Sequence, residues 1–158
     1  MIQTIHETIK KHNMLDGCGN IIAGLSGGSD SVCMLYALKN TVGDSYPAIQ
    51  LTAVHVNHML RGEDADRDEE YCADLCEKLN IPLVVKKVDA AAYGREHKIS
   101  EEMAGREIRY SIFQEVAKGL TNCKIAIAHN LDDRVETVLM NIIRGTGTSG
   151  LKGIPYVR

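Results

Sequence analysis

Six consecutive residues, Ser26 to Ser31 (SGGSDS), form the stretch of the sequence with the most distinctive chemistry. They follow an apolar run and precede an apolar pattern with helical spacing, so the chain turns there from a strand into a helix. Gly27 and Gly28 can adopt φ > 0 and let a ligand approach the backbone, and the N–H groups that open a helix attract anions. The stretch therefore predicts a phosphate-binding loop.

The chemistry of this loop differs from that of two common phosphate loops. It has neither the Lys of G-x-x-x-x-G-K-[ST] nor the third glycine of G-x-G-x-x-G. The hydroxyls of Ser26, Ser29 and Ser31 offer donors instead, and Asp30 fits best where Mg²⁺ lies between it and a phosphate. The alternative is a plain glycine turn with a Ser or Asp helix cap, which accounts for one glycine and one serine but not for all six residues.

A second polar group follows the last apolar run, where AHNLDDRVET carries His129, Asp132, Asp133 and Glu136. Spacings of three and four predict His129, Asp133 and Glu136 on one side of a helix. Three carboxylates and an imidazole suit Mg²⁺ coordination and proton transfer. Acids also complement the positive end of a helix dipole, but this alternative does not account for the histidine. We expect the apolar positions of the helix to face the core: Leu131, Val135, Val138, Leu139, Ile142 and Ile143.

Strands and helices that alternate along the chain must position these groups. Apolar runs predict strands at residues 20–26, 49–56, 81–89 and 123–129. Helical spacing predicts helices within residues 1–15, 31–40, 66–80, 100–120 and 131–145. This alternation predicts an α/β fold with a parallel sheet and helices on both faces. Ligands bind beyond the carboxyl ends of such strands, so we expect the loops at 26–31, 55–64 and 128–137 to converge.

Length and composition indicate one soluble domain: 158 residues, 44% of them hydrophobic. No run approaches the roughly 18 apolar residues of a membrane helix, and charges interrupt the N-terminus where a secretory signal would be apolar. Five cysteines without a C-x-x-C pair indicate a reducing cytoplasm, with Cys72 and Cys76 packed in the core. The net charge of −3 argues against nucleic-acid binding by bulk electrostatics, and we interpret the acid-rich run at 63–77 mainly as a solvated helix face.

S-G-G-x-D-S directly after the first strand resembles the pyrophosphate-binding loop of the N-type ATP pyrophosphatases, the PP-loop superfamily. These enzymes cleave ATP between the α and β phosphates and pass AMP to an oxygen of their substrate. Four further stretches resemble, in order, motifs of the N-terminal domain of the tRNA(Ile)-lysidine synthetases: HVNHMLR, EEMAGREIRY, AHNLDDRVET and RGTGTSGLKGI. Arg134 departs from the usual Gln, and Gly105 departs from the usual Ala, which loosens that helix by roughly 0.5–1 kcal/mol.

The resemblance implies a Rossmann-like fold of the adenine nucleotide alpha hydrolase type. It also implies that residues 1–158 are the N-terminal PP-loop, ATP-binding catalytic domain of a longer multidomain chain. The implied reaction has two steps. ATP adenylates the carbonyl oxygen at carbon 2 of the wobble cytidine in an isoleucine tRNA with a CAU anticodon, releasing pyrophosphate. Free lysine then attacks that carbon through its ε-amine, AMP leaves, and lysidine forms.

The same resemblance assigns roles to residues. Pyrophosphate is expected in the loop Ser26, Gly27, Gly28, Ser29, Asp30 and Ser31, and adenine on the backbone of Val54, His55 and Val56. Mg²⁺ is expected on Asp30, Asp132 and Asp133, whereas the catalytic set is Asp30, Arg106, His129, Asp133 and Glu136. Asp133 or Glu136 holds the lysine ammonium and helps to take its proton. Arg106 contacts phosphate or the activated nucleotide, with a surface arginine as the alternative, and His55 and His58 are as readily packing residues as ligands.

Two other functions stay open from the sequence. A PP-loop tRNA thiolase would deliver sulfur, which calls for catalytic cysteines near the active edge, and none of the five is well placed. A non-catalytic ATP-binding module would need the glycine loop but not the acids at 132–136. Monomer and homodimer are both left open. Arg144 with Gly145, Gly147, Gly150 and Gly153 predicts either a loop that closes over the nucleotide or tRNA, or a plain linker.

Overall fold

A four-stranded parallel sheet forms the centre of the computed structural model, which describes residues 2–146 and 152–155. Its strands are β1 (Asn20–Gly24), β2 (Gln50–Asn57), β3 (Leu83–Lys87) and β4 (Cys123–Ala126), in the order β3-β2-β1-β4. The three strand pairs are all parallel. The predicted parallel sheet is therefore confirmed, and the carboxyl ends of its strands lie at one edge.

Six helices are described: α1 (Ile2–Lys11), α2 (Ser29–Ser45), α3 (Glu63–Leu79), α4 (Ala90–His97), α5 (Glu101–Ala117) and α6 (Leu131–Ile143). The predicted cap of α5 is confirmed, since the Ser100 side chain accepts a hydrogen bond from the Met103 N–H. Helix α4 was not predicted. Asp89 caps it by accepting from the Ala92 N–H at 2.8 Å, and three alanines follow that aspartate. This pattern is a recognisable start signal for a helix.

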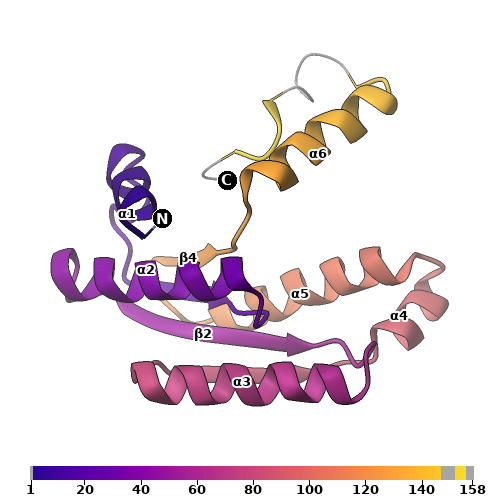
Figure 1. Cartoon of the computed structure of the whole chain (residues 1–158), viewed down its shortest axis with the longest axis horizontal. Helices are drawn as coiled ribbons and strands as arrows, with labels where there is room; N and C mark the ends of the chain where they lie inside the picture. The colour runs from indigo at the N-terminus through magenta and orange to yellow at the C-terminus, as the bar shows by residue number, and fades with distance from the viewer. Residues whose placement is uncertain (1, 147–151, 156–158) are drawn as a thin grey trace.

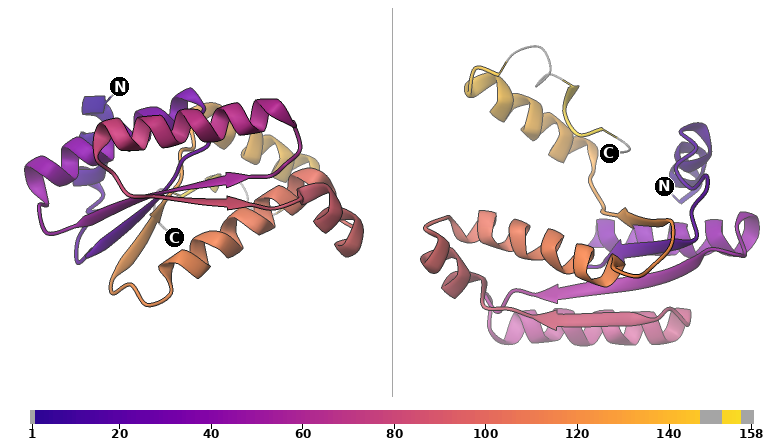
Figure 2. Two further views of the ribbon diagram at one scale, coloured as in Figure 1. Left: turned by 90° about the horizontal axis from the view of Figure 1, so that it is seen from below. Right: turned by 180° about the vertical axis from the view of Figure 1, so that it is seen from behind.

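Helices cover both faces of the sheet, as predicted, and each face has its own core. Ile21 on β1 packs in a cluster with Leu35 of α2 and Cys72 of α3. Its neighbour Ile22 points to the other face, where it packs in a cluster with Phe113 of α5. The left view of Figure 2 shows α3 and α5 on opposite sides of the strands. Cys72 and Cys76 are buried, so their predicted place in the core is confirmed.

Helix α6 corrects one expectation. Its apolar positions do not face the core: Leu131 is 72% exposed and Ile143 is 80% exposed, and α6 buries no residue. The helix stands away from the sheet in Figure 1. Apolar spacing specifies that a helix has one apolar face, but not which element covers it. Within the described residues no helix is long and apolar enough to span a membrane.

Candidate nucleotide-binding site

The loop from Ser26 to Ser31 joins β1 to α2 and is braced by its own serines. Ser31 Oγ donates to the Gly28 carbonyl at 2.9 Å and accepts from the Ser26 N–H at 3.1 Å. Gly27 has φ +86°, which a residue with a side chain rarely adopts, whereas Gly28 is the extended N-cap of α2. The hydroxyls of Ser26 and Ser31 therefore shape the loop. The N–H groups of the first turn of α2 are the better anion donors.

A cavity of about 290 Å³ opens beside this loop. Its lining comes from the loop after β1, the end of β2, the helices α3 and α5, and the segment after β4. This arrangement confirms that the loops after these three strands converge. The lining includes Ser26, Ser31, Val54, His55, Val56, Asn57, His58, Arg61, Asp68, Arg109 and Ala128.

His55 lies at the junction between the cavity and the loop. The side chain is 4% exposed, and its Nδ1 lies 2.8 Å from the Leu25 carbonyl. A carbonyl only accepts, so Nδ1 carries the proton and the bond ties β2 to the end of β1. Of the two alternatives stated for His55, ligand contact or hydrogen-bonded packing, the structure shows the hydrogen-bonded packing. Val54 and Val56 line the cavity on either side of it.

Two arginines of α5 lie one turn apart and in different surroundings. Arg106, the predicted contact, lies outside the cavity, with its guanidinium carbon 5.5 Å from the centre of the Tyr110 ring. Arg109 lines the cavity instead. The buried residues Ala104, Ile108 and Ile112 follow one face of α5, and Arg109, three residues before Ile112, lies nearer to that face than Arg106. The two arginines are only three residues apart, so their spacing in the sequence does not by itself tell them apart.

Other lining residues were also missed. Asp68 of α3 lies beside the phosphate loop, since a Cβ added to Gly27 would be 3.6 Å from its Oδ1. Arg61 lies in the HVNHMLR stretch, whose loop at 55–64 was expected at this edge of the sheet, but it was given no role; Asp68 belongs to the acid-rich run at 63–77. No local signal placed Asp68 at the cavity, because its position depends on how α3 packs beside the end of β2.

The first residues of α6 lie against the phosphate loop. Asn130 is the N-cap: its Oδ1 accepts from the Asp133 N–H at 2.9 Å, and its N–H donates to Asp133 Oδ2 at 2.8 Å. The Nδ2 of Asn130 donates to Asp30 Oδ2 at 2.9 Å. His129 precedes the helix, so it does not share a helix face with Asp133 and Glu136 as predicted. The structure therefore brings together Asp30, Asn130 and Asp133.

The carboxylates do not form a complete metal cage. Within residues 2–146 and 152–155 no three His, Cys, Asp or Glu side chains are grouped so as to hold a metal ion. The expected trio of Asp30, Asp132 and Asp133 is therefore not assembled. Asp30 and Asp133 each use one carboxylate oxygen in the bonds to Asn130. Their chemistry fits Mg²⁺ held by one or two carboxylates together with substrate phosphates, which is its usual mode. Most of the predicted glycine loop, residues 147–151, lies outside the described residues.

Comparisons with known proteins agree with this geometry. A family model described as a PP-loop domain matches residues 1–158. A tRNA(Ile)-lysidine synthase from Clostridium acetobutylicum is 50% identical over 158 residues, which are all of this chain and 34% of the relative. The tRNA(Ile)-lysidine synthase of Caldanaerobacter subterraneus subsp. tengcongensis is 46% identical over 157 residues, which are 99% of this chain and 33% of the relative.

A solved structure has the same fold. The U34-tRNA thiolase NcsA from Methanococcus maripaludis matches with a TM-score of 0.69 and 24% identity, over 91% of this chain and 51% of the thiolase. At that identity the likeness concerns the fold alone. The chain spans about a third of the length of the curated relatives it matches.

Proposed function

Because this chain belongs to the PP-loop domain family, we propose that it uses ATP to adenylate a tRNA base and then completes lysidine formation. The substrate is the wobble cytidine of an isoleucine tRNA, and free lysine is the second substrate. One observation carries the proposal. The cavity joins the phosphate loop to the ends of β2 and β4, and Asn130 links that loop to the acids of α6. The names of the similar proteins, tRNA(Ile)-lysidine synthase, support an isoleucine tRNA as substrate and lysidine as product.

In the first step the oxygen on carbon 2 of the cytidine attacks the α-phosphorus of ATP, and pyrophosphate leaves. The first turn of α2 and Gly27 bind the pyrophosphate, and the backbone of Val54 to Val56 reads the adenine edge. Arg109 contacts the phosphates, because it is the α5 arginine that lines the cavity. When Mg²⁺ is bound, Asp30 with Asp133 or Asp132 would hold it, and it would offset negative charge on the phosphates.

In the second step the ε-amine of lysine attacks carbon 2, and AMP leaves with the former carbonyl oxygen. The amine has an ordinary pKa of about 10.4, so it must lose a proton before it attacks. Asp133 uses its N–H and its Oδ2 in the capping bonds with Asn130, so its other oxygen, Oδ1, is the one placed to meet the lysine ammonium. Glu136, one turn further and exposed, takes the proton, and Asp133 orients the ammonium. His129 and Arg106 have no assigned step in this scheme.

The chain corresponds to about a third of each curated relative. It spans 34% of the C. acetobutylicum relative. The ATP-binding and adenylating chemistry is assigned to residues 1–158 as a PP-loop domain. We place the reaction in the cytoplasm, where the tRNA, ATP and lysine are available.

Thiolation is the second candidate, because the thiolase NcsA has the same fold. The cysteines argue against it. Burial raises the pKa of the Cys72 thiol to about 12, with the nearby Cys76 adding to the shift. Burial also raises the pKa of Cys76. The pKa of Cys123 is raised mainly by burial, with a smaller effect from the nearby Cys18. Thiols held in the protonated form are poor nucleophiles, so these three cysteines are poorly suited to sulfur transfer.

Pyrophosphate release tests the proposal. With ATP and isoleucine tRNA, release should require tRNA, and AMP should accumulate with lysine added. Glu136→Gln should slow AMP release about a hundredfold or more while leaving the first pyrophosphate burst in place. Release that ignores tRNA would indicate a hydrolase, and no release at all would favour a non-catalytic ATP-binding module. Replacement of Cys18, Cys33 and Cys123 by Ser, with Cys72 and Cys76 changed to Ala, should leave both rates within twofold.

A further inference from the structure

His58 occupies an unusual position in the cavity. It lies in the turn after β2 and lines the cavity together with Arg109. Its Nδ1 is buried and has no hydrogen-bond partner, the one such side-chain nitrogen or oxygen found in the described residues. Leaving a buried polar atom unpaired costs about 1–3 kcal/mol, so such an atom in a ligand cavity points to a partner supplied by the ligand.

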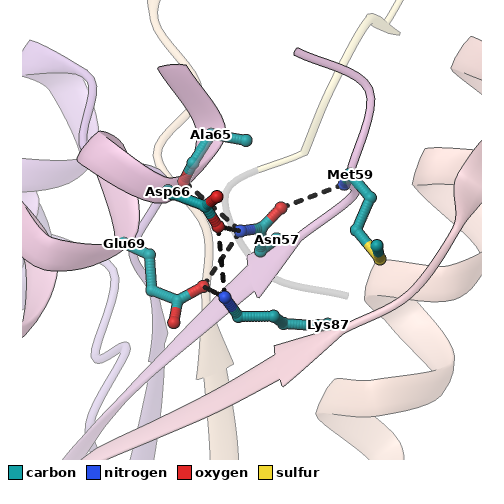
Figure 3. Close-up of polar contacts among 6 residues, drawn as sticks. All are labelled: Asn57, Met59, Ala65, Asp66, Glu69 and Lys87. Carbon is teal, nitrogen blue, oxygen red and sulfur yellow. Dashed lines mark hydrogen bonds and ion pairs between the residues drawn. The ribbon is translucent and has the colours of Figure 1, made fainter. Parts of the chain in front are cut away.

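The residues around His58 hold it in place. Asn57 is 3% exposed, and its Nδ2 donates to Glu69 Oε2 at 2.9 Å and to Asp66 Oδ1 at 3.3 Å. Lys87 lies 3.1 Å from each of the two carboxylates (Figure 3). The Asn57 cluster, meaning Asn57, Asp66, Glu69 and Lys87, thus fastens the end of β2 to α3 and β3. Two of its members belong to the run that the sequence indicated as a solvated face.

Two hydrogen bonds fix the backbone around His58, and the first comes from the same cluster. Asn57 Oδ1 accepts from the Met59 N–H at 3.0 Å, which stabilises Met59 at φ +56° (Figure 3). The His58 carbonyl accepts from the Ala90 N–H at 3.2 Å. Holding a non-glycine residue at positive φ costs energy, and such positions gather at functional sites. The backbone that carries the imidazole is therefore held on both sides of His58, at the wall of the cavity.

The position of His58 indicates what it binds, because it lines the cavity two residues after Val54 to Val56, the backbone proposed to read the adenine edge. Its surroundings agree: burial, the guanidinium of Arg109 and the nearby His55, in that order, lower the pKa of the imidazole. A lowered pKa favours the neutral imidazole, with one ring nitrogen that donates and one that accepts. Arg109 already supplies positive charge for phosphate. A neutral imidazole suits an uncharged hydroxyl or base-edge atom better.

Building on the proposed function, we infer that His58 is a further ligand-binding residue, whose Nδ1 hydrogen-bonds the nucleoside part of ATP. The Asn57 cluster positions His58 by holding the backbone next to it. This role differs from that of the phosphate loop, which binds the other end of the same ligand.

Three substitutions at one position test the role of Nδ1. His58→Phe keeps the ring volume and removes both nitrogens. His58→Asn places an amide where Nδ1 lies, and His58→Gln places it nearer Nε2. The matched control is His97→Phe, since His97 lies on α4 outside the cavity and its ring stacks on Tyr93 at 3.9 Å. Binding of ATP, AMP and inorganic pyrophosphate is measured by calorimetry on the whole chain, and thermal melting monitors folding.

We expect His58→Phe to weaken ATP and AMP binding on the order of tenfold and to leave pyrophosphate binding unchanged. His58→Asn should recover most of the affinity, His58→Gln should not, and His97→Phe should match the unaltered chain. The melting temperature of His58→Phe should stay the same or rise, because an unpaired polar atom has been removed.

Each other outcome overturns the inference. If the unaltered chain binds ATP and folded His58→Phe binds it equally, His58 is not a ligand contact, although the proposed function stands. If pyrophosphate binding falls in parallel with AMP binding, His58 serves the phosphate end instead. If the unaltered chain binds neither ATP nor AMP, the proposed function fails together with the inference.

Discussion

The side-chain amide of Asn130 donates a hydrogen bond to Asp30 Oδ2 at 2.9 Å and joins two residues that are 100 positions apart. Asp30 belongs to the phosphate loop, and Asn130 opens the helix that carries Asp133 and Glu136. Helix α6 buries no side chain within the described residues, and this polar contact ties its N-cap to the loop. One amide group thus links the two halves of the candidate site.

The substitution Asn130→Ser should keep the helix cap of α6 and remove the contact with Asp30. Serine caps a helix about as well as asparagine, so the stability of the chain should change by no more than about 0.5 kcal/mol. Its shorter side chain cannot reach Asp30, and we expect the rate of AMP release to fall about tenfold. Asn130→Asp should be slower still, because it places a second carboxylate against Asp30. Unchanged rates in Asn130→Ser would show that the contact does not align the site.

The two arginines of α5 offer a matched pair. Arg109→Ala removes a charge that lines the cavity, and we expect ATP to bind about 10- to 100-fold more weakly, as for the loss of a hydrogen bond to a charged group. Arg106→Ala removes the same charge from the outer side of the helix, where it lies over Tyr110, and should change the affinity less than twofold. Calorimetric titration with ATP measures both. The reverse order of effects would restore Arg106 as the nucleotide contact.

The sheet could be predicted from the sequence because buried parallel strands and their crossover helices leave strong local patterns. The phosphate loop could be predicted because glycine at φ > 0 and an exposed helix start are local requirements. The choice of Arg109 over Arg106 depended on how α5 packs against the sheet, because the two arginines lie only one turn apart on the same helix. In the sequence Asp66 and Glu69 resemble the acids of a solvated helix face. In the structure Asn57 of β2 and Lys87 of β3 contact them. Contacts between distant segments of that kind have no local signal.

Gly105→Ala should stabilise the chain by about 0.5–1 kcal/mol, because alanine favours a helix interior over glycine. There is room for the methyl group: a Cβ at position 105 would lie 3.7 Å from the His58 ring, at ordinary contact distance. Gly24→Ala is the opposite control, since its Cβ would lie 2.8 Å from Phe113 Cζ and force that ring to move. Urea unfolding at pH 7.5 measures both changes. A loss of stability in Gly105→Ala would mean that the His58 turn does not have the described geometry.

The pH dependence of stability follows from His58. Its pKa in the folded chain is lowered below 6.5, so below about that pH the unfolded chain binds a proton more readily than the folded chain. Stability should be fully present above pH 6.5 and decline as the pH falls towards the folded pKa. The charged and titratable groups that line this cavity with His58 are Arg61, Asp68, His55 and Arg109. Burial, Arg109 and His55 are the causes that lower the pKa of His58.

Urea unfolding between pH 5 and pH 8 measures that slope. His58→Phe should flatten it, and His97→Phe should leave it as it is. The pKa of Glu69 is lowered from 4.5 mainly by the Asn57 hydrogen bond, so its contribution should be lost only in more acidic solution. An equal slope in His58→Phe and the unaltered chain between pH 5 and pH 6.5 would contradict the assignment to His58.

Transfer of an oxygen atom tests the proposed adenylation most directly. An isoleucine tRNA is prepared with oxygen-18 on carbon 2 of the wobble cytidine and incubated with the protein, ATP and lysine. If the cytidine oxygen attacks the α-phosphorus, the AMP released must carry one labelled oxygen, and the pyrophosphate must carry none. Unlabelled AMP, formed from ATP by attack of water, would contradict adenylation of the base.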